Sequence, residues 1–536
     1  MKTNLLLSLI ERVSIMLAAI FILLSLNSCK KQPKEFLILS GSENGPLEKI
    51  VTEFARKNNI LVKFKYEGSV DIMLELQKNA LKYDAVWPAS GIWITLGDEE
   101  RKVRYAQSIM TSPVVFGIKM SLAKRLGFVG REVKVSEILK AIREKKLRFM
   151  MTSASQSNSG ASAYIGFLYA LLGHPEYITS DDLEKPELKK EITDLLAGIN
   201  RSSGSSAWLK DLYLRGDYNA MVNYESLLIE TNQELIRKGK EPLYIIYPTD
   251  GLVIADSQLG YIDGGNVKKE DFFKKLQAHL LSEDIQHQLL LLGRRTGFAG
   301  ELKNAPPAVF NPDWGIDTKK ILSPIKLPRA DVMLKALNLY QTAFRKPSLT
   351  FFCLDYSGSM IGGNIDQVKK AMEILLDQDK AGAYFLQSSP NDITFVIPFA
   401  GTIFDAWQVE GNKQSEMLHL LSKIRETKTD GNTDIYSPAI LALEQTLMID
   451  SAKYIPAIIL MTDGESNTGK KYADLESAWK KNGRDVPVFL IKFGDASDAQ
   501  LAQIANLTNG AVFDGRKDLI GAFRKVKGYN LSLIHI

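Results

Sequence analysis

A short apolar run that ends in oxygen-bearing side chains constrains the fold of this chain more than any other feature. Thr350–Leu354 is too short for a helix and favours β structure, so it predicts a buried strand of a parallel sheet. The run stops at Asp355, and Ser357 and Ser359 follow at alternate positions around Gly358. Because α/β folds place ligands at the carboxyl ends of parallel strands, this turn is a candidate site. Carboxylate and hydroxyl oxygens are ligands that a hard cation such as Mg²⁺ takes together with water.

Two other segments supply oxygen-bearing side chains that a sheet would bring to the same edge. Gly431–Asp434 opens a helix predicted over Ile435–Met448, and it contributes the hydroxyl of Thr433. Ile458–Met461 is a second apolar strand and runs into Asp463. Two strand ends and one helix start would converge on one cation. The alternative is that these Ser and Asp side chains only form local hydrogen bonds in strand-end turns. The predicted metal ligands are Asp355, Ser357, Ser359, Thr433 and Asp463.

This pattern closely resembles the von Willebrand factor type A (VWA) domain and its metal-ion-dependent adhesion site (MIDAS). The resemblance covers about Pro347–Tyr529, and every ligand position of the motif is filled. It implies a doubly wound, Rossmann-like α/β domain that holds Mg²⁺ or another divalent cation such as Ca²⁺ or Mn²⁺. It also implies a protein partner that completes the coordination with an acidic side chain. A closed metal that only ties strand ends together is the alternative.

The N-terminal segment differs in composition from the rest of the chain. Val13–Leu26 is a compact apolar run, too short for an ordinary membrane span but of the length of a signal-peptide core. It runs into Leu-Asn-Ser-Cys, which resembles a bacterial lipobox, and that resemblance implies cleavage before a lipidated Cys29. Lys30–Lys34 would then be a polar tether, and an uncleaved short anchor helix is the alternative. Both interpretations predict a protein of the bacterial cell envelope that is anchored to a membrane and faces away from the cytoplasm.

The region from Glu35 to Gly300 alternates predicted strands and helices. Small polar residues recur after the strands, as in α/β folds that bind ligands at strand ends. The hydroxyl-rich loop Thr152–Ser162 enters an apolar helical run, where it would hold an oxyanion or merely cap the helix. A single long helix is predicted over Asp271–Leu291.

The order of these elements resembles a two-lobed, type II bacterial extracellular solute-binding protein of the periplasmic-binding-protein class. The resemblance implies that the chain crosses between lobes twice, near Ser112–Gly117 and Tyr247–Val253. It also implies a cleft for a small oxyanion or polar solute. Carried over by position, the ligand contacts would come from Ser42, Ser69, Ser90, Ser155, Ser157 and Tyr224.

Prolines punctuate the segment between the two α/β regions, but apolar residues persist there, so we expect a structured connector. The apolar C-terminal end resembles sequencing-adapter read-through, and we expect the natural C-terminus to be missing. The predicted organisation is a signal peptide at 1–29, a tether at 30–34, a solute-binding-like domain at 35–300, a connector at 301–346, a VWA domain at 347–529 and an uncertain tail at 530–536.

Composition and missing motifs narrow the functional classes. The chain has 67 basic and 62 acidic residues without a dense basic run, so we expect no nucleic-acid partner. Only five histidines are present, and neither His-Glu-x-x-His nor Gly-x-Ser-x-Gly occurs. Gly464–Lys470 spells Gly-x-x-x-x-Gly-Lys, but Lys471 stands where a phosphate-binding loop needs Ser or Thr. We therefore expect a binding protein and not an enzyme.

Two binding functions remain. In the first, the envelope lipoprotein binds a protein partner through the VWA metal site, and the solute-binding-like region is a second recognition module. In the second, the protein is the substrate-capture component of an uptake system of the ABC type, with the VWA domain as a docking element. The filled set of metal ligands favours the first.

Overall fold

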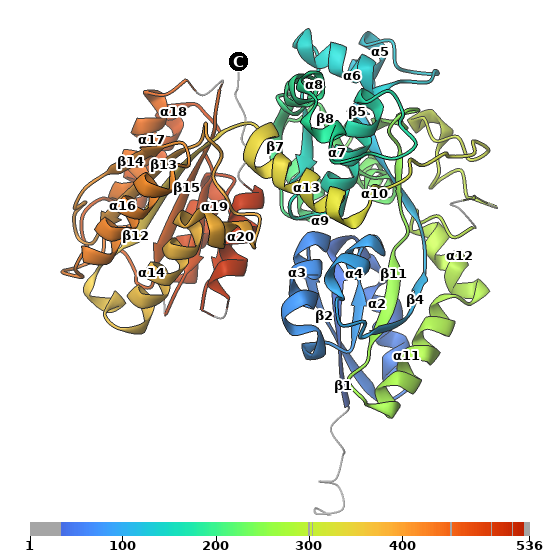
Figure 1. The fold of residues 1–536 in the computed structure, drawn as a ribbon, viewed down its shortest axis with the longest axis horizontal. Helices are drawn as coiled ribbons and strands as arrows, with labels where there is room; N and C mark the ends of the chain where they lie inside the picture. Colours follow the sequence, from blue (N-terminus) through green and yellow to red (C-terminus); the bar gives the residue numbers. More distant parts are fainter. Residues whose placement is uncertain are drawn as a thin grey trace, which may run out of the picture.

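Three β-sheets covered by helices organise the chain, as the predicted α/β class requires (Figure 1). The computed structural model describes residues 34–297, 301–302, 304–450, 453–494, 496–516 and 518–529, without the side chains of 79 and 527–529. The predicted signal peptide, the lipidation of Cys29, nearly all of the tether and the tail at 530–536 lie outside these residues. Within the described ranges, no helix has the length and apolar character that a bilayer span needs.

The first sheet has five strands and forms the lobe that we call lobe 1. Its strands are β1 (Lys34–Gly41), β2 (Ile60–Glu67), β3 (Ala85–Trp87), β4 (Val103–Ser108) and β11 (Gln258–Ile262). Its helices are η1 (Ser42–Leu47), α2 (Glu48–Lys57), α3 (Ser69–Asn79), η2 (Ala80–Lys82), α4 (Ile92–Gly97), α11 (Val267–Leu280) and α12 (Glu283–Leu291). The strand order is β2-β1-β3-β11-β4, with β1, β2 and β3 parallel and β11 antiparallel to its neighbours. Phe36 and Trp87 pack against α2 and α11, whereas α3 and α4 cover the other face.

The second sheet forms lobe 2. Its strands are β5 (Ser112–Lys119), β6 (Phe149–Thr152), β7 (Ile199–Ser203), β8 (Ala220–Tyr224), β9 (Leu243–Ile246) and β10 (Val253–Ala255). Its helices are α5 (Met120–Arg125), α6 (Val135–Arg143), α7 (Asn158–Leu171), η3 (Asp182–Glu184), α8 (Pro186–Leu196), α9 (Ser206–Arg215) and α10 (Glu225–Arg237). The order is β10-β5-β8-β6-β7, and β9 also pairs with β5. The buried face of the apolar helix α7 packs on this sheet, and its core extends to Val70 and Trp93 of lobe 1.

Two short segments connect the lobes, residues 109–111 between β4 and β5 and residues 256–257 between β10 and β11. They run side by side, joined by a backbone hydrogen bond of 3.2 Å. The crossings that were predicted near Ser112–Gly117 and Tyr247–Val253 are therefore displaced. The first lies directly before the predicted segment, and the second lies a few residues after it. Both predicted segments belong to lobe 2, and the first true crossing begins with buried apolar residues, so no polar punctuation marks it.

The long helix predicted over Asp271–Leu291 is two helices, α11 and α12. Ser282 separates the two helices, because its backbone is extended, with φ −66° and ψ 149°. Its hydroxyl donates to the carbonyl of His279 at 2.7 Å. Glu283 and Asp284 then occupy the first turn of α12, where acidic side chains are favourable. The apolar residues continue across the break, which is why their periodicity alone predicted one helix.

A structured connector joins lobe 2 to the third sheet. It contains η5 (Pro312–Trp314), α13 (Ala330–Leu339) and the π-helical turn η6 (Tyr340–Phe344). Tyr164 of lobe 2 packs edge-on against Tyr340, with ring centroids 5.3 Å apart, and its hydroxyl donates to the carbonyl of Ala336 at 2.9 Å. The connector is thus part of the core of lobe 2.

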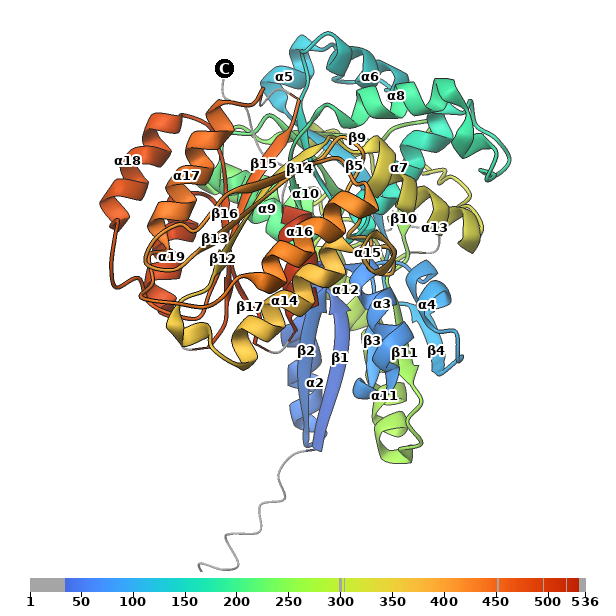
Figure 2. The ribbon, with the colours of Figure 1, turned by 60° about the vertical axis from the view of Figure 1, so that its left-hand side comes forward.

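The third sheet carries the predicted doubly wound domain. Its strands are β12 (Ser348–Asp355), β13 (Ile393–Phe399), β14 (Trp407–Glu410), β15 (Ile455–Thr462), β16 (Val488–Lys492) and β17 (Val512–Asp514). Its helices are η7 (Gly358–Met360), α14 (Gly363–Leu376), α15 (Gln378–Gly382), α16 (Gln414–Glu426), α17 (Tyr436–Leu447), α18 (Tyr472–Asn482), α19 (Asp498–Leu507) and α20 (Leu519–Tyr529). The order is β14-β13-β12-β15-β16-β17, parallel except for the edge strand β14. Helices α14, α16 and α20 cover one face and α17, α18 and α19 the other (Figure 2). The central strand β12 is buried throughout, so its carboxyl end is held rigidly.

Candidate metal centre and solute cleft

The carboxyl edge of the third sheet gathers the five predicted metal ligands. Asp355 ends β12, Asp463 directly follows β15, and Thr433 lies just before α17. The hydroxyls of Ser357 and Ser359 are 3.1 Å apart, and Ser359 donates to Asp463 Oδ1 at 2.7 Å. A methyl group on Gly464 would lie 3.3 Å from Ser359 Oγ and 3.4 Å from Thr433 Oγ1, so the two hydroxyl groups lie close to the same position beside Gly464.

Backbone hydrogen bonds hold the ligand loops against one another. The N–H of Gly358 donates to the carbonyl of Gly431 at 3.0 Å, which ties the serine loop to the threonine loop. The N–H of Thr433 donates to the side chain of Asn467 at 3.0 Å. Asp434 is not free to act as a ligand, because it accepts from the N–H groups of Ser437 and Lys470 at 3.1 and 3.0 Å. It caps α17 and fixes the loop after β15.

The charge of the centre suits a cation. Burial raises the pKa of Asp355, and the negative charge of Asp463 acts in the same direction, whereas hydrogen bonds from Ser357 and Thr462 lower it. The other carboxylate is held by neutral groups, since Asn364 donates to Asp463 Oδ2 at 2.6 Å. Two carboxylates and three hydroxyls therefore form an all-oxygen donor set of limited charge, which fits Mg²⁺ with retained water.

The centre has few carboxylates and faces solvent on one side. No group of three or more His, Cys, Asp or Glu side chains in the described part of the chain is placed to hold a metal. Ser359 is exposed, and the neighbouring Ile361 is 69% exposed. The open side leaves room for a group from outside the chain.

The two lobes of the N-terminal region are closed on each other. The N–H of Val70 in lobe 1 donates to the carbonyl of Gln156 in lobe 2 at 2.9 Å, and the Trp93 indole donates to Asn158 Oδ1 at 2.7 Å. A cavity of about 10 Å³ remains at the interface, room for one water. Its polar lining is Glu43, Thr111, Ser112, Tyr224, Ser226, Ser257 and Arg294.

The six predicted solute contacts are distributed unevenly around this cleft. Tyr224 lines the cavity, and its hydroxyl accepts from Asn158 at 3.0 Å. Ser42 Oγ accepts from the N–H of Ala207 across the lobes at 3.4 Å, whereas Ser69 Oγ accepts from the N–H of Ala89 within lobe 1 at 3.1 Å. The other three are buried: Ser90 in lobe 1, Ser155 beside the connector, and Ser157, which is 3.2 Å from the Ser206 hydroxyl. Solute contact by these residues stays a prediction.

Charged residues that the sequence did not single out dominate the cleft. Burial raises the pKa of Glu43 to about 7, although its own N–H and the charge of Arg294 oppose the shift. Arg294 is paired with Glu230 at 2.7 Å, and Arg295 with Glu225 at 2.7 Å. Glu43 follows the end of a strand, and this position in the sequence could have identified it as a residue of the cleft. No local sequence pattern identifies the paired arginines as residues of the cleft.

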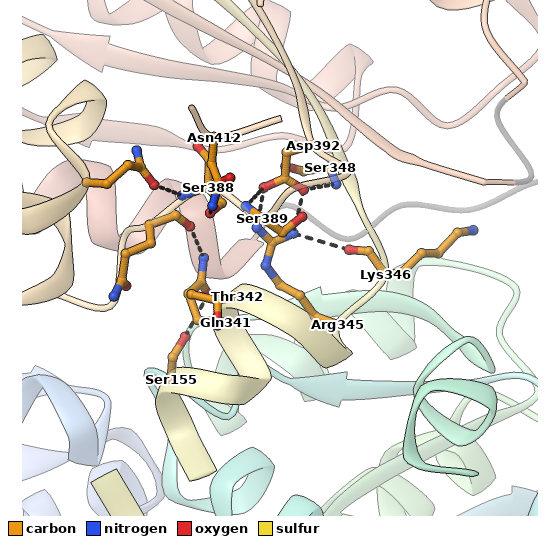
Figure 3. A network of polar contacts seen from close by, with 12 residues as sticks. Ser155, Gln341, Thr342, Arg345, Lys346, Ser348, Ser388, Ser389, Asp392 and Asn412 are labelled. Atoms are coloured by element: carbon orange, nitrogen blue, oxygen red, sulfur yellow. Dashed lines mark hydrogen bonds and ion pairs between the residues drawn. The ribbon is translucent and has the colours of Figure 1, made fainter. Parts of the chain in front are cut away.

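A polar network holds the third sheet against the connector (Figure 3). Gln341 donates to the carbonyl of Gln387 at 2.8 Å and accepts from Ser155 Oγ at 3.4 Å. Asp392 accepts from Nη1 and Nη2 of Arg345, at 3.1 and 2.5 Å. Burial opposes the charged form of Asp392, but Arg345 and two backbone N–H groups outweigh it and lower the pKa.

Comparisons with known proteins agree with this architecture. A family model described as "Bacterial extracellular solute-binding protein" matches residues 37–290, and one described as "von Willebrand factor type A domain" matches residues 351–518. The chain therefore combines a solute-binding domain with a VWA domain, which confirms the resemblance to each of these two domains. The solute-binding domain places the protein outside the cytoplasm, secreted or periplasmic.

Individual relatives cover parts of the chain. Human "Inter-alpha-trypsin inhibitor heavy chain H6" is 29% identical over 174 residues, which are 30% of this chain and 12% of that protein. The periplasmic binding protein P5PA is 13% identical and covers 58% of this chain and 100% of its own, with a TM-score of 0.43. AfuA from Actinobacillus pleuropneumoniae, with fructose-6-phosphate bound, is also 13% identical, covers 58% and 98%, and has a TM-score of 0.43.

Proposed function

We propose that this protein is a bacterial cell-envelope lipoprotein whose VWA domain holds a divalent cation and binds a protein partner through it. The observation that carries the proposal is the meeting of two carboxylates and three hydroxyls at the solvent-facing carboxyl edge of the VWA sheet. The expected anchor at Cys29 would keep the domain at the membrane. The protein acts by binding and not by catalysis.

The ligand residues have separate tasks in this proposal. Bound Mg²⁺, or Ca²⁺ or Mn²⁺, supplies an electrophilic centre for one outside oxygen ligand. Ser357, Ser359 and Thr433 offer neutral oxygens, directly or through water, so the positive charge is only partly compensated. Asp355 and Asp463 supply that partial compensation from the buried side. An acidic side chain of the partner, Glu or Asp, then completes the coordination from the exposed side near Ile361.

Substrate capture for an uptake system is the second candidate function. The two-lobed domain and its buried, charged interlobe cavity favour it. In that case a small polar solute binds between the lobes, and the VWA domain docks the loaded protein elsewhere in the envelope. The two functions are compatible in one chain.

The test compares Asp463→Ala with Asp366→Ala in the full chain. Asp366 is an exposed aspartate in the first turn of α14, so its removal makes the same change in charge close to the site. Mg²⁺ at 100 times its dissociation constant should stabilise the wild type by about 2.7 kcal/mol, and Asp366→Ala equally. Asp463→Ala should lose that stabilisation, as followed by calorimetric titration and thermal unfolding.

Partner binding is measured in parallel with immobilised protein and solubilised envelope proteins. The retained protein should be released by EDTA and competed by a peptide with an exposed Glu, but not by its Gln counterpart. Retention that EDTA leaves unchanged would refute binding through a metal. Loss of the circular-dichroism spectrum in EDTA would instead indicate a closed structural metal.

A further inference from the structure

The last helix of the VWA domain places an arginine at the junction of the two lobes. Arg524 of α20 is 4% exposed, although it lies on a helix of a different domain. Its Nε forms an ion pair with Asp71 of lobe 1, and its Nη2 donates to the carbonyl of Ser155 in lobe 2 at 3.0 Å. The side chain of Gln156 donates to the Arg524 carbonyl. One guanidinium group is thus bound by both lobes, at the position where α20 lies beside them (Figure 1).

A second cation from the same helix strengthens this arrangement. Lys525 Nζ lies 3.2 Å from Glu67 Oε1, at the end of β2. Burial raises the pKa of Glu67, whereas Lys525 and Lys65 oppose the rise. Between Glu67 and Asp71 the chain passes through Gly68, where a methyl group would lie 2.3 Å from the carbonyl oxygen of Gln156. The two acidic residues therefore lie on either side of a close contact between the lobes.

Deeper in the cleft, acidic side chains also outnumber basic ones, with Glu43, Glu225 and Glu230 against Arg294 and Arg295. Arg294 is neutralised by Glu230, and Arg295 by a bidentate pair with Glu225 at 2.7 Å for each bond. Glu43 is left with a buried Oε1 that has no hydrogen-bond partner among the described residues. An oxyanion would have to displace the carboxylate that is paired with Arg294 or Arg295, whereas a cation would meet the unpaired oxygen of Glu43.

We propose that the interlobe cleft binds a small organic cation with a guanidinium or primary ammonium group, and that Arg524 occupies its mouth as an internal competitor. Glu67 and Asp71 bind the cationic head group at the mouth, and Glu43 provides an acidic acceptor further in. The predicted hydroxyl-rich loop supplies the Ser155 carbonyl to this site.

The internal occupant fits its site imperfectly, which favours exchange. Both Arg524 Nη1 and Gln156 Oε1 are buried without a partner in the described part of the chain. A free ligand is not restrained by a helix and can satisfy such atoms when the lobes open. Binding of the ligand would release α20 from lobe 1, so solute binding and packing of the VWA domain against the lobes exclude each other.

The test is titration of agmatine, an alkyl guanidinium with a terminal ammonium group, into the full chain and its variants in EDTA. Arg524→Ala should bind agmatine at least about tenfold more tightly than the wild type, because a tethered competitor acts at a high effective concentration. Arg516→Ala is the matched control, since Arg516 pairs with Asp514 at the exposed surface of the same domain. It should bind agmatine like the wild type.

Further variants separate the site from folding effects. Adding Asp71→Asn to Arg524→Ala should abolish the gain, while sulfate and phosphate should bind none of the proteins. If Arg524→Ala does not fold, as judged by circular dichroism, Arg524→Lys replaces it and should give a smaller gain. Equal or absent agmatine binding by wild type and variant, or preferential binding of sulfate, would overturn the proposal. Since EDTA is present throughout, this result is independent of the proposed metal site.

Discussion

The buried ion pair at the start of the VWA domain allows a quantitative prediction. Asp392 is 2% exposed and accepts four hydrogen bonds, two from Arg345 and two from the N–H groups of Ser348 and Ser389 at 2.7 and 2.8 Å. Asp392→Asn keeps the volume but removes the charge and part of the acceptor capacity. Arg345, whose side chain is 8% exposed, is then left as an uncompensated buried cation. Breaking a buried pair from one side costs about 3–5 kcal/mol.

Hydrogen exchange with mass spectrometry suits this prediction, because it reports opening free energies of β12 and β13 separately from those of the lobes. Asp392→Asn should lower those free energies by about 3–5 kcal/mol at pH 7. The control is Asp514→Asn, which removes an exposed pair with Arg516 and should cost at most about 1 kcal/mol.

The pH dependence gives a second readout with a definite sign. The pKa of Asp392 is lower in the folded than in the unfolded chain, so its contribution to stability is complete above the unfolded pKa of about 3.9. The contribution is lost as the pH falls through the lower folded value. The difference between wild type and Asp392→Asn should therefore shrink in acid. A cost below about 1 kcal/mol at pH 7 would refute the reasoning, as would a difference that stays constant into acid.

Two further predictions concern the cleft and the anchor. Gly68→Ala should hold the lobes apart and raise the radius of gyration in small-angle scattering, because the new methyl group would lie 2.3 Å from the carbonyl oxygen of Gln156. Gly45→Ala is the control and should leave the radius unchanged, because the space around Gly45 is open. An unchanged radius of gyration in both variants would argue against the closed geometry of the lobes. Cys29→Ser should abolish fatty-acid labelling and leave the precursor uncleaved, and persistent labelling would exclude lipidation at this cysteine.

The VWA sheet and its five predicted ligands were accessible from sequence because the information is local. The runs that form β12 and β15 are continuous and apolar, and each ends directly in the residues that line the site. The residue spacing after each strand is set by the turn itself. Parallel pairing then brings the strand ends together whatever the rest of the chain does.

The cleft depends on partners far apart in the chain, and local patterns do not contain them. Arg524 lies in an ordinary amphipathic helix, and no neighbouring residue in the sequence indicates that it will form an ion pair with Asp71. Arg294 and Arg295 follow a helix as two basic residues would on any surface, yet both are buried. Pairing of charges is decided by the packing of domains, which hydrophobic periodicity does not encode.

The position of β11 has a consequence for how the protein is made. This strand lies between β3 and β4, yet it is synthesised after all the strands of the lobe 2 sheet. The sheet of lobe 1 therefore has a gap until Gln258–Ile262 has emerged, while the sheet of lobe 2 can be completed first. We expect the strands of lobe 2 to pair first as the chain leaves the membrane, with the edges of β3 and β4 exposed in the interval. Chaperones of the envelope would find their binding sites on those two strands.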